Sequence, residues 1–167
     1  MKRSWFMTSC LIIYSFAGYT VSSWCIFTDR ELNYQLEYPC SWWVEDHTRK
    51  KGMIRADLSH SSMGFQIRQY AKNRSLESFA LRYVEKFKQD METHWKGKME
   101  FISASCEQNR YWAHLRLKRA DGQVWDFWEY IFADQNNFVA FQCGAPYDET
   151  QDAGNVFEQI ANSFRFL

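Results

Sequence analysis

Alternating apolar and polar positions dominate the stretch from Met99 to Gly144. Four short runs rich in β-branched and aromatic residues are separated by polar turns, and this pattern predicts a four-stranded antiparallel meander. Asp121-Gly122 is the strongest turn signal, because a two-residue type I′ turn requires positive φ, which glycine adopts without strain. A second two-residue turn is predicted at Gln135-Asn136. The predicted strands are Met99–Glu107, Tyr111–Arg119, Val124–Phe132 and Phe138–Gly144.

Two-residue turns at these places would fix which residues face each other. The first turn would place Leu115 opposite Trp128 and His114 opposite Glu129, and the second would place Trp128 opposite Cys143. One face of the meander would then be almost wholly apolar, and we expect it to form core. This predicted core face comprises Ala113, Leu115, Leu117, Trp128, Tyr130, Phe132, Val139, Phe141 and Cys143.

The opposite face would combine large aromatic rings with charged groups. Neither a fully solvated face nor a fully buried face has this composition, so we expect it to be half covered by another element. Aromatic and arginine side chains are enriched where proteins bind partners. The alternative is that the N-terminal strands or a helix cover these residues, and a second candidate surface, Trp42-Trp43, could instead close one end of the fold. The candidate partner-binding residues are Trp112, His114, Arg116, Trp125, Phe127 and Glu129.

Two helical periodicities and several short strands surround the meander. Apolar residues at the i, i+3, i+4 and i+7 positions predict a helix from Ser75 to about His94, with Ser75 as its N-cap. A second helix is predicted at Thr150–Asn162. An antiparallel sheet packed with two helices belongs to the α+β class. The other predicted strands are Trp24–Asp29, Asn33–Tyr38, Met53–Ser59 and Gly64–Ala71.

Length and composition indicate a single packed domain. The chain has 167 residues and no repeat or linker, which is enough for one proper core. Aromatic residues make up 19% of it, more than a disordered or coiled-coil chain carries. The 20 Lys and Arg residues balance the 20 Asp and Glu residues, and this argues against a protein that binds nucleic acid through its phosphates.

The N-terminus has the pattern of a secretory signal peptide. A basic start, Met1-Lys2-Arg3, precedes an apolar run that is shorter than the roughly 20 residues of a membrane span. Small residues at Val21 and Ser23 fit cleavage before Trp24, with Ser15 and Ala17 as an earlier alternative. We therefore expect a signal peptide over residues 1–23, a single domain over residues 24–167, and no membrane span after cleavage. The alternative is an uncleaved anchor or a buried first helix.

Four cysteines remain after the predicted cleavage: Cys25, Cys40, Cys106 and Cys143. An even number in an exported protein suggests two disulfides. Cys106 and Cys143 would lie on the outer strands of the meander, about 14 Å apart at about 4.8 Å per strand, which exceeds the Cα reach of a disulfide. If bonds form, Cys25 and Cys40 should each take a partner from the other two. The alternative is four buried thiols.

No catalytic motif stands out in the sequence. A Gly-rich phosphate loop, a Gly-x-Ser-x-Gly elbow and a His-Glu-x-x-His motif are all missing. His114 with Glu129 could form an acid–base pair beside Ser103 or Ser105, but an ordinary cross-strand charge pair is the simpler interpretation. The prediction is therefore that the protein is not an enzyme and has no catalytic residues.

Metal binding is also not expected. The histidines with acidic neighbours lack the paired His or Cys spacing of a dedicated metal site. We predict neither a metal nor a cofactor. The three places considered are His47 beside Glu45 and Asp46, His60 near Asp57, and His94 beside Glu92.

Several of these residues together resemble the PsbP-like superfamily. The shared pattern is Tyr34-x-Leu36-x-Tyr38-Pro39-x-x-Trp42, the helix led by Ser75-Leu76, the Asp121-Gly122 hairpin, and the closing Phe157-x-x-Ile160-x-x-Ser163-Phe164. The resemblance covers Leu32–Leu167 and includes the PsbP protein of photosystem II, envelope proteins of the DcrB type and a Ran-binding import factor. It implies an α/β/α sandwich with a non-enzymatic binding or assembly role, and no catalytic residues to transfer.

The chain departs from this family by lacking a lipidation cysteine, since Cys25 follows the bulky Trp24. Membrane tethering of the DcrB type is therefore not expected. We predict an exported, periplasmic or secreted module that binds a protein partner. The alternatives are a small hydrolase that uses His114 and Glu129, and a periplasmic protein that binds a metal or small ligand.

Overall fold

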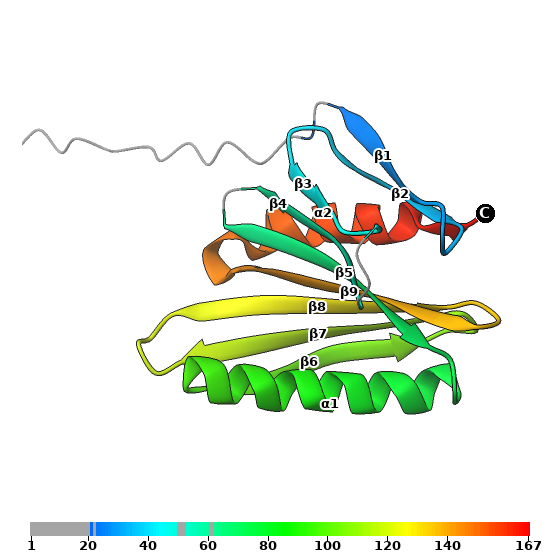
Figure 1. Ribbon diagram of the computed structural model, residues 1–167. Helices are drawn as coiled ribbons and strands as arrows, with labels where there is room; N and C mark the ends of the chain where they lie inside the picture. The colour runs from blue at the N-terminus through cyan, green and yellow to red at the C-terminus, as the bar shows by residue number, and fades with distance from the viewer. Residues whose placement is uncertain (1–20, 22, 50–52, 61) are drawn as a thin grey trace, which may run out of the picture.

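The computed structural model describes residues 21, 23–49, 53–60 and 62–167 (Figure 1). The predicted signal peptide lies largely outside these residues. Within them, seven strands form one antiparallel sheet in the order β3-β4-β5-β9-β8-β7-β6, and three form a smaller sheet in the order β1-β2-β10. The strands are β1 (Trp24–Asp29), β2 (Tyr34–Pro39), β3 (Trp43–Asp46), β4 (Ile54–His60), β5 (Met63–Ala71), β6 (Gly97–Cys106), β7 (Arg110–Arg119), β8 (Val124–Ala133), β9 (Asn137–Pro146) and β10 (Arg165–Phe166).

Two long helices cover opposite faces of the larger sheet (Figure 1). Helix α1 (Leu76–Trp95) packs over β6, β7 and β8. Helix α2 (Thr150–Ser163) follows the short helix η1 (Tyr147–Glu149) and packs on the other face together with the small sheet. The order is therefore α1, seven-stranded sheet, then α2 with the small sheet. This arrangement confirms the predicted α+β class.

Helix α1 forms where its apolar periodicity predicts it. Leu76, Ala80, Val84 and Phe87 are buried on one side of the helix. The Ser75 side chain accepts a hydrogen bond from the backbone N–H of Ser78 at 3.3 Å, which confirms the predicted N-cap.

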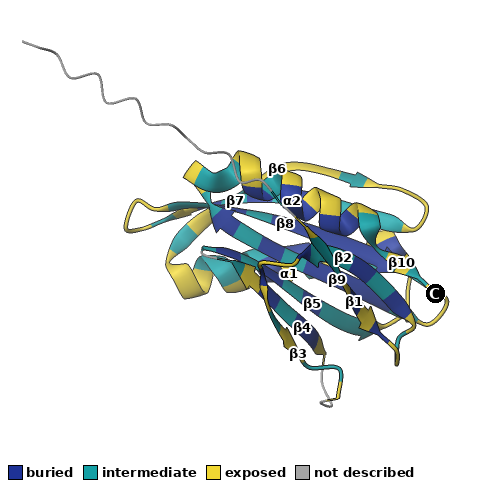
Figure 2. Cartoon of the chain, turned by 90° about the horizontal axis from the view of Figure 1, so that it is seen from above, coloured by how far each residue is buried: buried dark blue, intermediate teal, exposed yellow. Residues whose placement is uncertain are grey.

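The central strands of the larger sheet are buried on both faces, and each face belongs to its own apolar cluster. The cluster under α2 contains Trp128, Tyr130 and Phe141 with residues of the small sheet such as Tyr34. The cluster under α1 contains Leu115 among its buried residues. Figure 2 shows the resulting run of buried residues along the central strands, viewed from above. Strands covered on both sides can carry apolar residues without the alternation of a half-exposed sheet.

One predicted register is wrong by one residue. Leu115 faces Phe127 rather than Trp128, and His114 faces Trp128 rather than Glu129. The cause is the length of the turn. The backbone N–H of Arg119 donates to the carbonyl oxygen of Gln123 at 2.9 Å, so the loop between them has three residues, the last of which is Gly122 with φ +86°. Such loops end in a left-handed glycine that forms a bulge.

The one-residue shift moves every side chain of β7 to the other face. Ala113, Leu115 and Leu117 therefore lie under α1, whereas Trp128, Tyr130, Phe132, Val139, Phe141 and Cys143 lie under α2. The predicted single core face is thus divided between two clusters. The register at Gln135-Asn136 is confirmed, since Trp128 faces Cys143 and Tyr130 faces Phe141.

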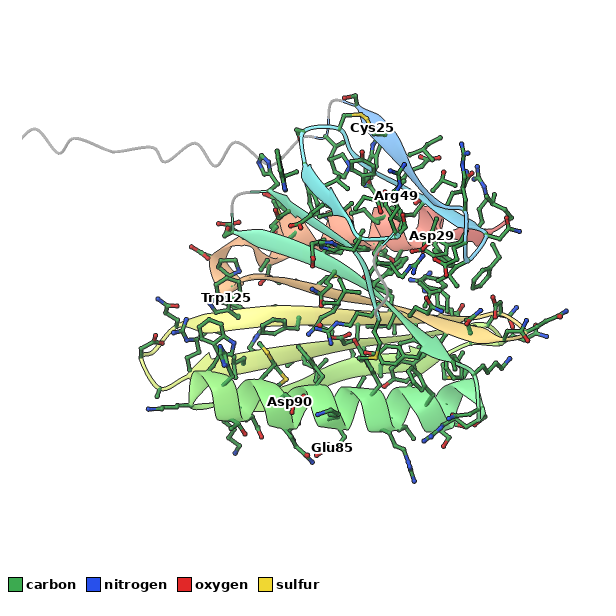
Figure 3. The ribbon with its side chains drawn as sticks, viewed as in Figure 1. Cys25, Asp29, Arg49, Glu85, Asp90 and Trp125 are labelled. Atoms are coloured by element: carbon green, nitrogen blue, oxygen red, sulfur yellow. A yellow bond between two sulfur atoms is a disulfide. The ribbon has the colours of Figure 1, made fainter. Side chains whose placement is uncertain are left out.

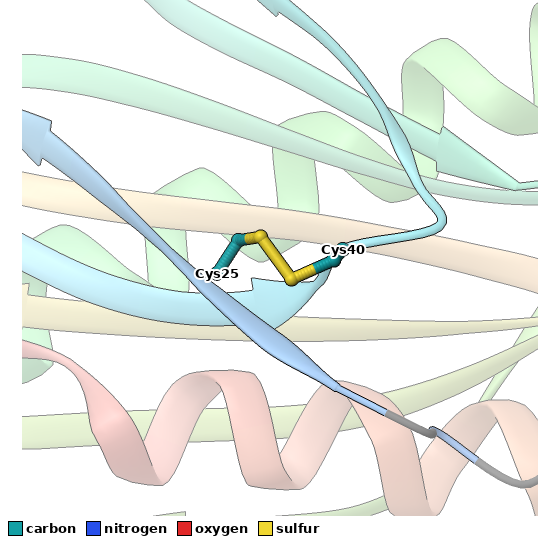
Figure 4. Close-up of a disulfide and its surroundings, with 2 residues drawn as sticks. All are labelled: Cys25 and Cys40. Carbon is teal, nitrogen blue, oxygen red and sulfur yellow. A yellow bond between two sulfur atoms is a disulfide. The ribbon is translucent and has the colours of Figure 1, made fainter.

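In the part of the chain that the structure describes, one disulfide joins the start of β1 to the residue after β2 (Figure 4). Cys25 and Cys40 are bonded with Cα atoms 5.0 Å apart, while Cys106 is an exposed thiol and Cys143 a buried one. The predicted cross-pairing is wrong because β1 and β2 form a hairpin that places Cys25 opposite Tyr38, next to Cys40. Neighbouring strands bring these two cysteines together, so neither needs a partner from the meander.

Strand β6 forms one edge of the larger sheet. Its pairing with β7 is interrupted between Phe101 and Ser103 by a shift of register. Phe101 and Ile102, at this bulge, are about half exposed. The free edge is therefore irregular at its middle.

Candidate functional site

The six candidate partner-binding residues do not share one face. Trp112, His114 and Arg116 of β7 lie on the α2 side of the sheet, while Trp125, Phe127 and Glu129 of β8 lie on the α1 side. The register shift described above separates them. Trp112, Trp125 and Phe127 are partly buried against the two clusters, so the alternative that other elements cover them holds in part. Partner binding by these residues stays a prediction, now for two separate surfaces.

The charged members on the α2 side form a network around Asp126. This fully buried carboxylate accepts two hydrogen bonds from Arg116, at 2.8 and 3.0 Å, and one from the Thr150 hydroxyl at 2.9 Å. His114 Nε2 lies 3.2 Å from Asp126 Oδ2, in ion-pair range but not aligned for a good hydrogen bond, and its ring stacks on Trp128. Burial raises the pKa of Asp126, but these donors outweigh it and hold that pKa well below its usual range.

The predicted cross-strand pairing of His114 with Glu129 is wrong, and with it both the charge pair and the alternative acid–base pair. His114 and Trp128 are cross-strand partners and share a face, so the neighbouring Glu129 points to the other side of the sheet. A carboxylate and an imidazole on opposite faces cannot exchange a proton directly. The hydrolase based on this pair is therefore excluded.

A cavity of about 500 Å³ opens between α1 and β5, where the helix does not cover the sheet. Helix α1 contributes Phe79, Arg82, Tyr83, Lys86, Phe87 and Asp90, and Figure 3 labels Asp90 on this helix. The remaining lining residues come from β5, the segment after it, β9 and the chain before β4: Arg68, Tyr70, Ala71, Asn73, Arg74, Gln142 and Met53. We call this the α1–β5 cavity.

Aromatic rings form a continuous wall in the α1–β5 cavity. Tyr70 lies 5.2 Å from Phe79 and 5.6 Å from Tyr83, measured between ring centroids. Phe79 stacks in turn on the buried Phe138 at 4.2 Å. Rings held by such contacts give a wall that exists before a ligand arrives.

A fully buried carboxyl group, Glu129, lies next to the lining of the cavity. Glu129 faces the lining residue Gln142 across β8 and β9. Among the described residues, no hydrogen-bond partner of ordinary geometry reaches either carboxyl oxygen. Burial raises the pKa of Glu129 well above its usual range, although the nearby Tyr83 hydroxyl and Arg68 guanidinium oppose this. Burial therefore favours the neutral form of the Glu129 carboxyl over its charged form, as for other buried acids without a strong ion pair.

Replacing Glu129 by glutamine is expected to flatten the pH dependence of stability. The folded protein keeps this proton while the unfolded chain releases it above about pH 4.3, so the wild type loses stability as the pH rises from there toward the raised pKa. Glutamine carries no such proton. Denaturant unfolding should therefore show a stability advantage for Glu129→Gln at about pH 8 that disappears near pH 4.

The matched control is Glu85→Gln, at an exposed carboxyl of α1 (Figure 3). It should leave the pH profile of the wild type unchanged. An advantage for Glu129→Gln that is equally large at both pH values would show that Glu129 is ionised in the folded protein.

The histidines considered as metal ligands lie apart from the cavity lining. His47 Nε2 lies 3.0 Å from Asp57 Oδ2 and 3.6 Å from Glu45 Oε1. Within the described ranges, no three His, Cys, Asp or Glu side chains gather as a metal site would require.

The two residues of the second candidate surface, Trp42 and Trp43, lie in different environments. Trp42 is buried and packs edge-on against Phe157, while Trp43 is 73% exposed.

Sequence reasoning missed the residues that line the α1–β5 cavity. One available signal was the alternation of Gln66, Arg68 and Tyr70 with Phe65 and Ile67 along β5. This pattern places polar and aromatic side chains on one face of a strand whose other face is core. A second signal was the pair Arg82 and Lys86, one helical turn apart at the border of the apolar stripe of α1.

Comparison with solved structures shows that the chain has a PsbP-like fold. The solution structure of the cyanobacterial PsbP protein (CyanoP) from Synechocystis matches with a TM-score of 0.67 and 15% sequence identity, over 93% of this chain and 99% of that one. The crystal structure of LpqN, described as involved in cell envelope biogenesis of Mycobacterium tuberculosis, matches with a TM-score of 0.50 and 11% identity, over 78% and 81% of the two chains.

A protein from Bacteroides thetaiotaomicron also matches, with a TM-score of 0.53 and 11% identity. The match covers 85% of this chain but 48% of that one. No protein-family model and no curated protein sequence matches this chain. Among the described residues, none of the helices is long and apolar enough to span a membrane.

Proposed function

We propose that this protein is an exported, non-enzymatic binding module of the cell envelope or the secreted space. The observation that carries the proposal is the α1–β5 cavity, a preformed site with an aromatic wall. Its lining contains no Ser, Thr, Cys or His side chain, and its lysine and its carboxylate, Lys86 and Asp90, are paired with each other at 2.9 Å. The residues present can hold a molecule but offer little with which to transform it.

Export is supported by the Cys25–Cys40 disulfide. Disulfides persist in oxidising compartments and are rare in the cytosol. The signal-like N-terminus favours the same route, with residues 24–167 as the exported domain. LpqN, which has a similar fold, is described as an envelope biogenesis protein, and this agrees with an envelope role.

Blocking the cavity should abolish binding without unfolding the protein. Ala71 is exposed at the end of β5 and lines the cavity, so Ala71→Trp would place an indole in its opening. The full chain, expressed with a C-terminal tag, would be recovered from the envelope and the medium, cross-linked, and studied by non-reducing mass analysis and native mass spectrometry. We expect a chain that begins at Trp24, retains one disulfide, and carries a partner or ligand that Ala71→Trp loses.

The matched control is Ala104→Trp, at an exposed alanine of β6 outside the cavity, which should keep the bound species. Equal binding by the two variants would remove the cavity from the proposal. A chain that retains Met1, stays in the cytoplasm and has a reduced Cys25 would overturn export.

A further inference from the structure

The α1–β5 cavity concentrates positive charge in a chain that is neutral overall. The full sequence has equal numbers of acidic and basic residues, whereas the lining has Arg68, Arg74, Arg82 and Lys86 against the single acid Asp90. Lys86 already pairs with Asp90 at 2.9 Å. The three arginines Arg68, Arg74 and Arg82 therefore give the cavity lining its positive charge.

No described carboxylate forms an ion pair with any of these three arginines. Arg68 Nε donates to Gln66 and Arg74 Nε to Asn73, both of which are neutral amides. A guanidinium is always charged and its fork of donors suits a carboxylate or phosphate. Guanidiniums that line a cavity without a described carboxylate in ion-pair range thus complement an anion.

The lining also has a large apolar part. Tyr70, Phe79, Tyr83 and Phe87 provide ring surfaces, and the exposed Met53 extends this surface at the opening. A purely ionic ligand would leave these surfaces unused, and a purely apolar one would leave the arginines without a partner. The lining requires both parts in one molecule.

We infer that the α1–β5 cavity binds a small amphiphilic anion, with its hydrocarbon part against the aromatic wall and its carboxylate or phosphate on Arg68, Arg74 and Arg82. This inference rests on the proposed function and specifies its ligand class. Glu129 is compatible with it, because its full burial disfavours a negative charge on its carboxyl beside the bound anion. The volume of about 500 Å³ falls within the usual range of small-molecule sites.

Ligands that share one hydrocarbon chain and differ in head group test the inference. The protein, purified with its disulfide intact, would be titrated calorimetrically with laurate, dodecyl phosphate, dodecyl maltoside and dodecyltrimethylammonium, each below its micelle concentration. We expect both anions to bind once per chain and at least about ten-fold more tightly than the neutral and cationic compounds, since hydrogen bonds to charged groups are stronger than those to neutral ones. Added salt should weaken the binding of the anions.

Arg82→Glu identifies the site. Arg82 is exposed on α1, and a glutamate there would stand one turn before Lys86, an arrangement that favours the helix. The variant should fold normally and bind laurate at least about ten-fold more weakly. Lys88→Glu makes the same charge change on the same helix outside the lining and should bind laurate like the wild type.

Three results would overturn the inference: no binding by either anion, equal or tighter binding by the neutral or cationic compound, or equal losses in Arg82→Glu and Lys88→Glu. The proposed function fails separately. If the exported protein carries a species that Ala71→Trp loses while the dodecyl anions do not bind, the binding module stands and only its ligand class is wrong.

Discussion

Replacing Asp29 by asparagine is expected to lower the free energy of unfolding by about 3–5 kcal/mol, the cost of removing one partner from a buried ion pair. Asp29 at the end of β1 is fully buried and holds Arg55 of β4 by two hydrogen bonds, at 2.7 and 3.0 Å. Arg55 is itself 2% exposed. Its remaining partner, Glu31, is largely exposed and cannot replace a buried charge. Urea unfolding at neutral pH measures the effect.

The double variant Asp29→Asn/Arg55→Met should recover much of this loss, because it leaves no unpaired charge in the interior. In the wild type, Asp29 Oδ1 accepts hydrogen bonds from the backbone N–H groups of Glu31 and Leu32, at 3.0 and 3.1 Å. The side-chain oxygen of asparagine can accept the same two bonds. The matched control is Lys86→Ala, which breaks an exposed pair and should change stability by less than about 1 kcal/mol. A similarly small effect of Asp29→Asn would show that the buried pair does not hold the two sheets together.

Removing the Cys25–Cys40 disulfide is expected to cost about 3 kcal/mol, the value for a closed loop of about 15 residues. The bond chiefly restricts the unfolded chain, so the Cys25→Ser/Cys40→Ser variant should keep the native fold and unfold at a lower urea concentration. Reduction of the wild type should produce the same shift. Circular dichroism during urea unfolding checks both.

Cys106→Ser is the control for the loss of a thiol, because Cys106 is exposed and unbonded. It should change stability by no more than about 0.5 kcal/mol. Cys143 is less suitable as a control, since burial raises the pKa of its thiol and its side chain belongs to the core. If the serine double variant matches the wild type in stability, the β1–β2 hairpin is equally constrained without the bond.

Local patterns in the sequence predicted most elements of the fold. The helix from Ser75 was predicted to within a few residues because its apolar stripe and its cap agree. The register across Asp121-Gly122 was not, because the same glycine serves both a two-residue turn and a three-residue loop with a bulge. Which of the two turns forms depends on which face of each strand packs into the two apolar clusters, and this is decided by contacts between distant parts of the chain.

The candidate site was harder to predict because it arises between elements. Arg68, Tyr70 and Arg82 become neighbours only because α1 lies over β6–β8 and leaves part of β5 uncovered. The helical pattern places Arg82 at the border of the apolar stripe of α1, but it does not predict which strand lies beside that border. The disulfide pairing failed for a related reason, since the even cysteine count suggested two bonds, whereas the hairpin offered only one.

The irregular middle of β6 has a consequence at high concentration. An edge strand of this length presents a row of unpaired backbone groups on which a second chain could add a strand. The bulge between Phe101 and Ser103 breaks the even spacing of these groups and twists the strand locally. A regular strand of a second chain cannot pair with β6 along its full length, so the bulge disfavours edge-to-edge aggregation.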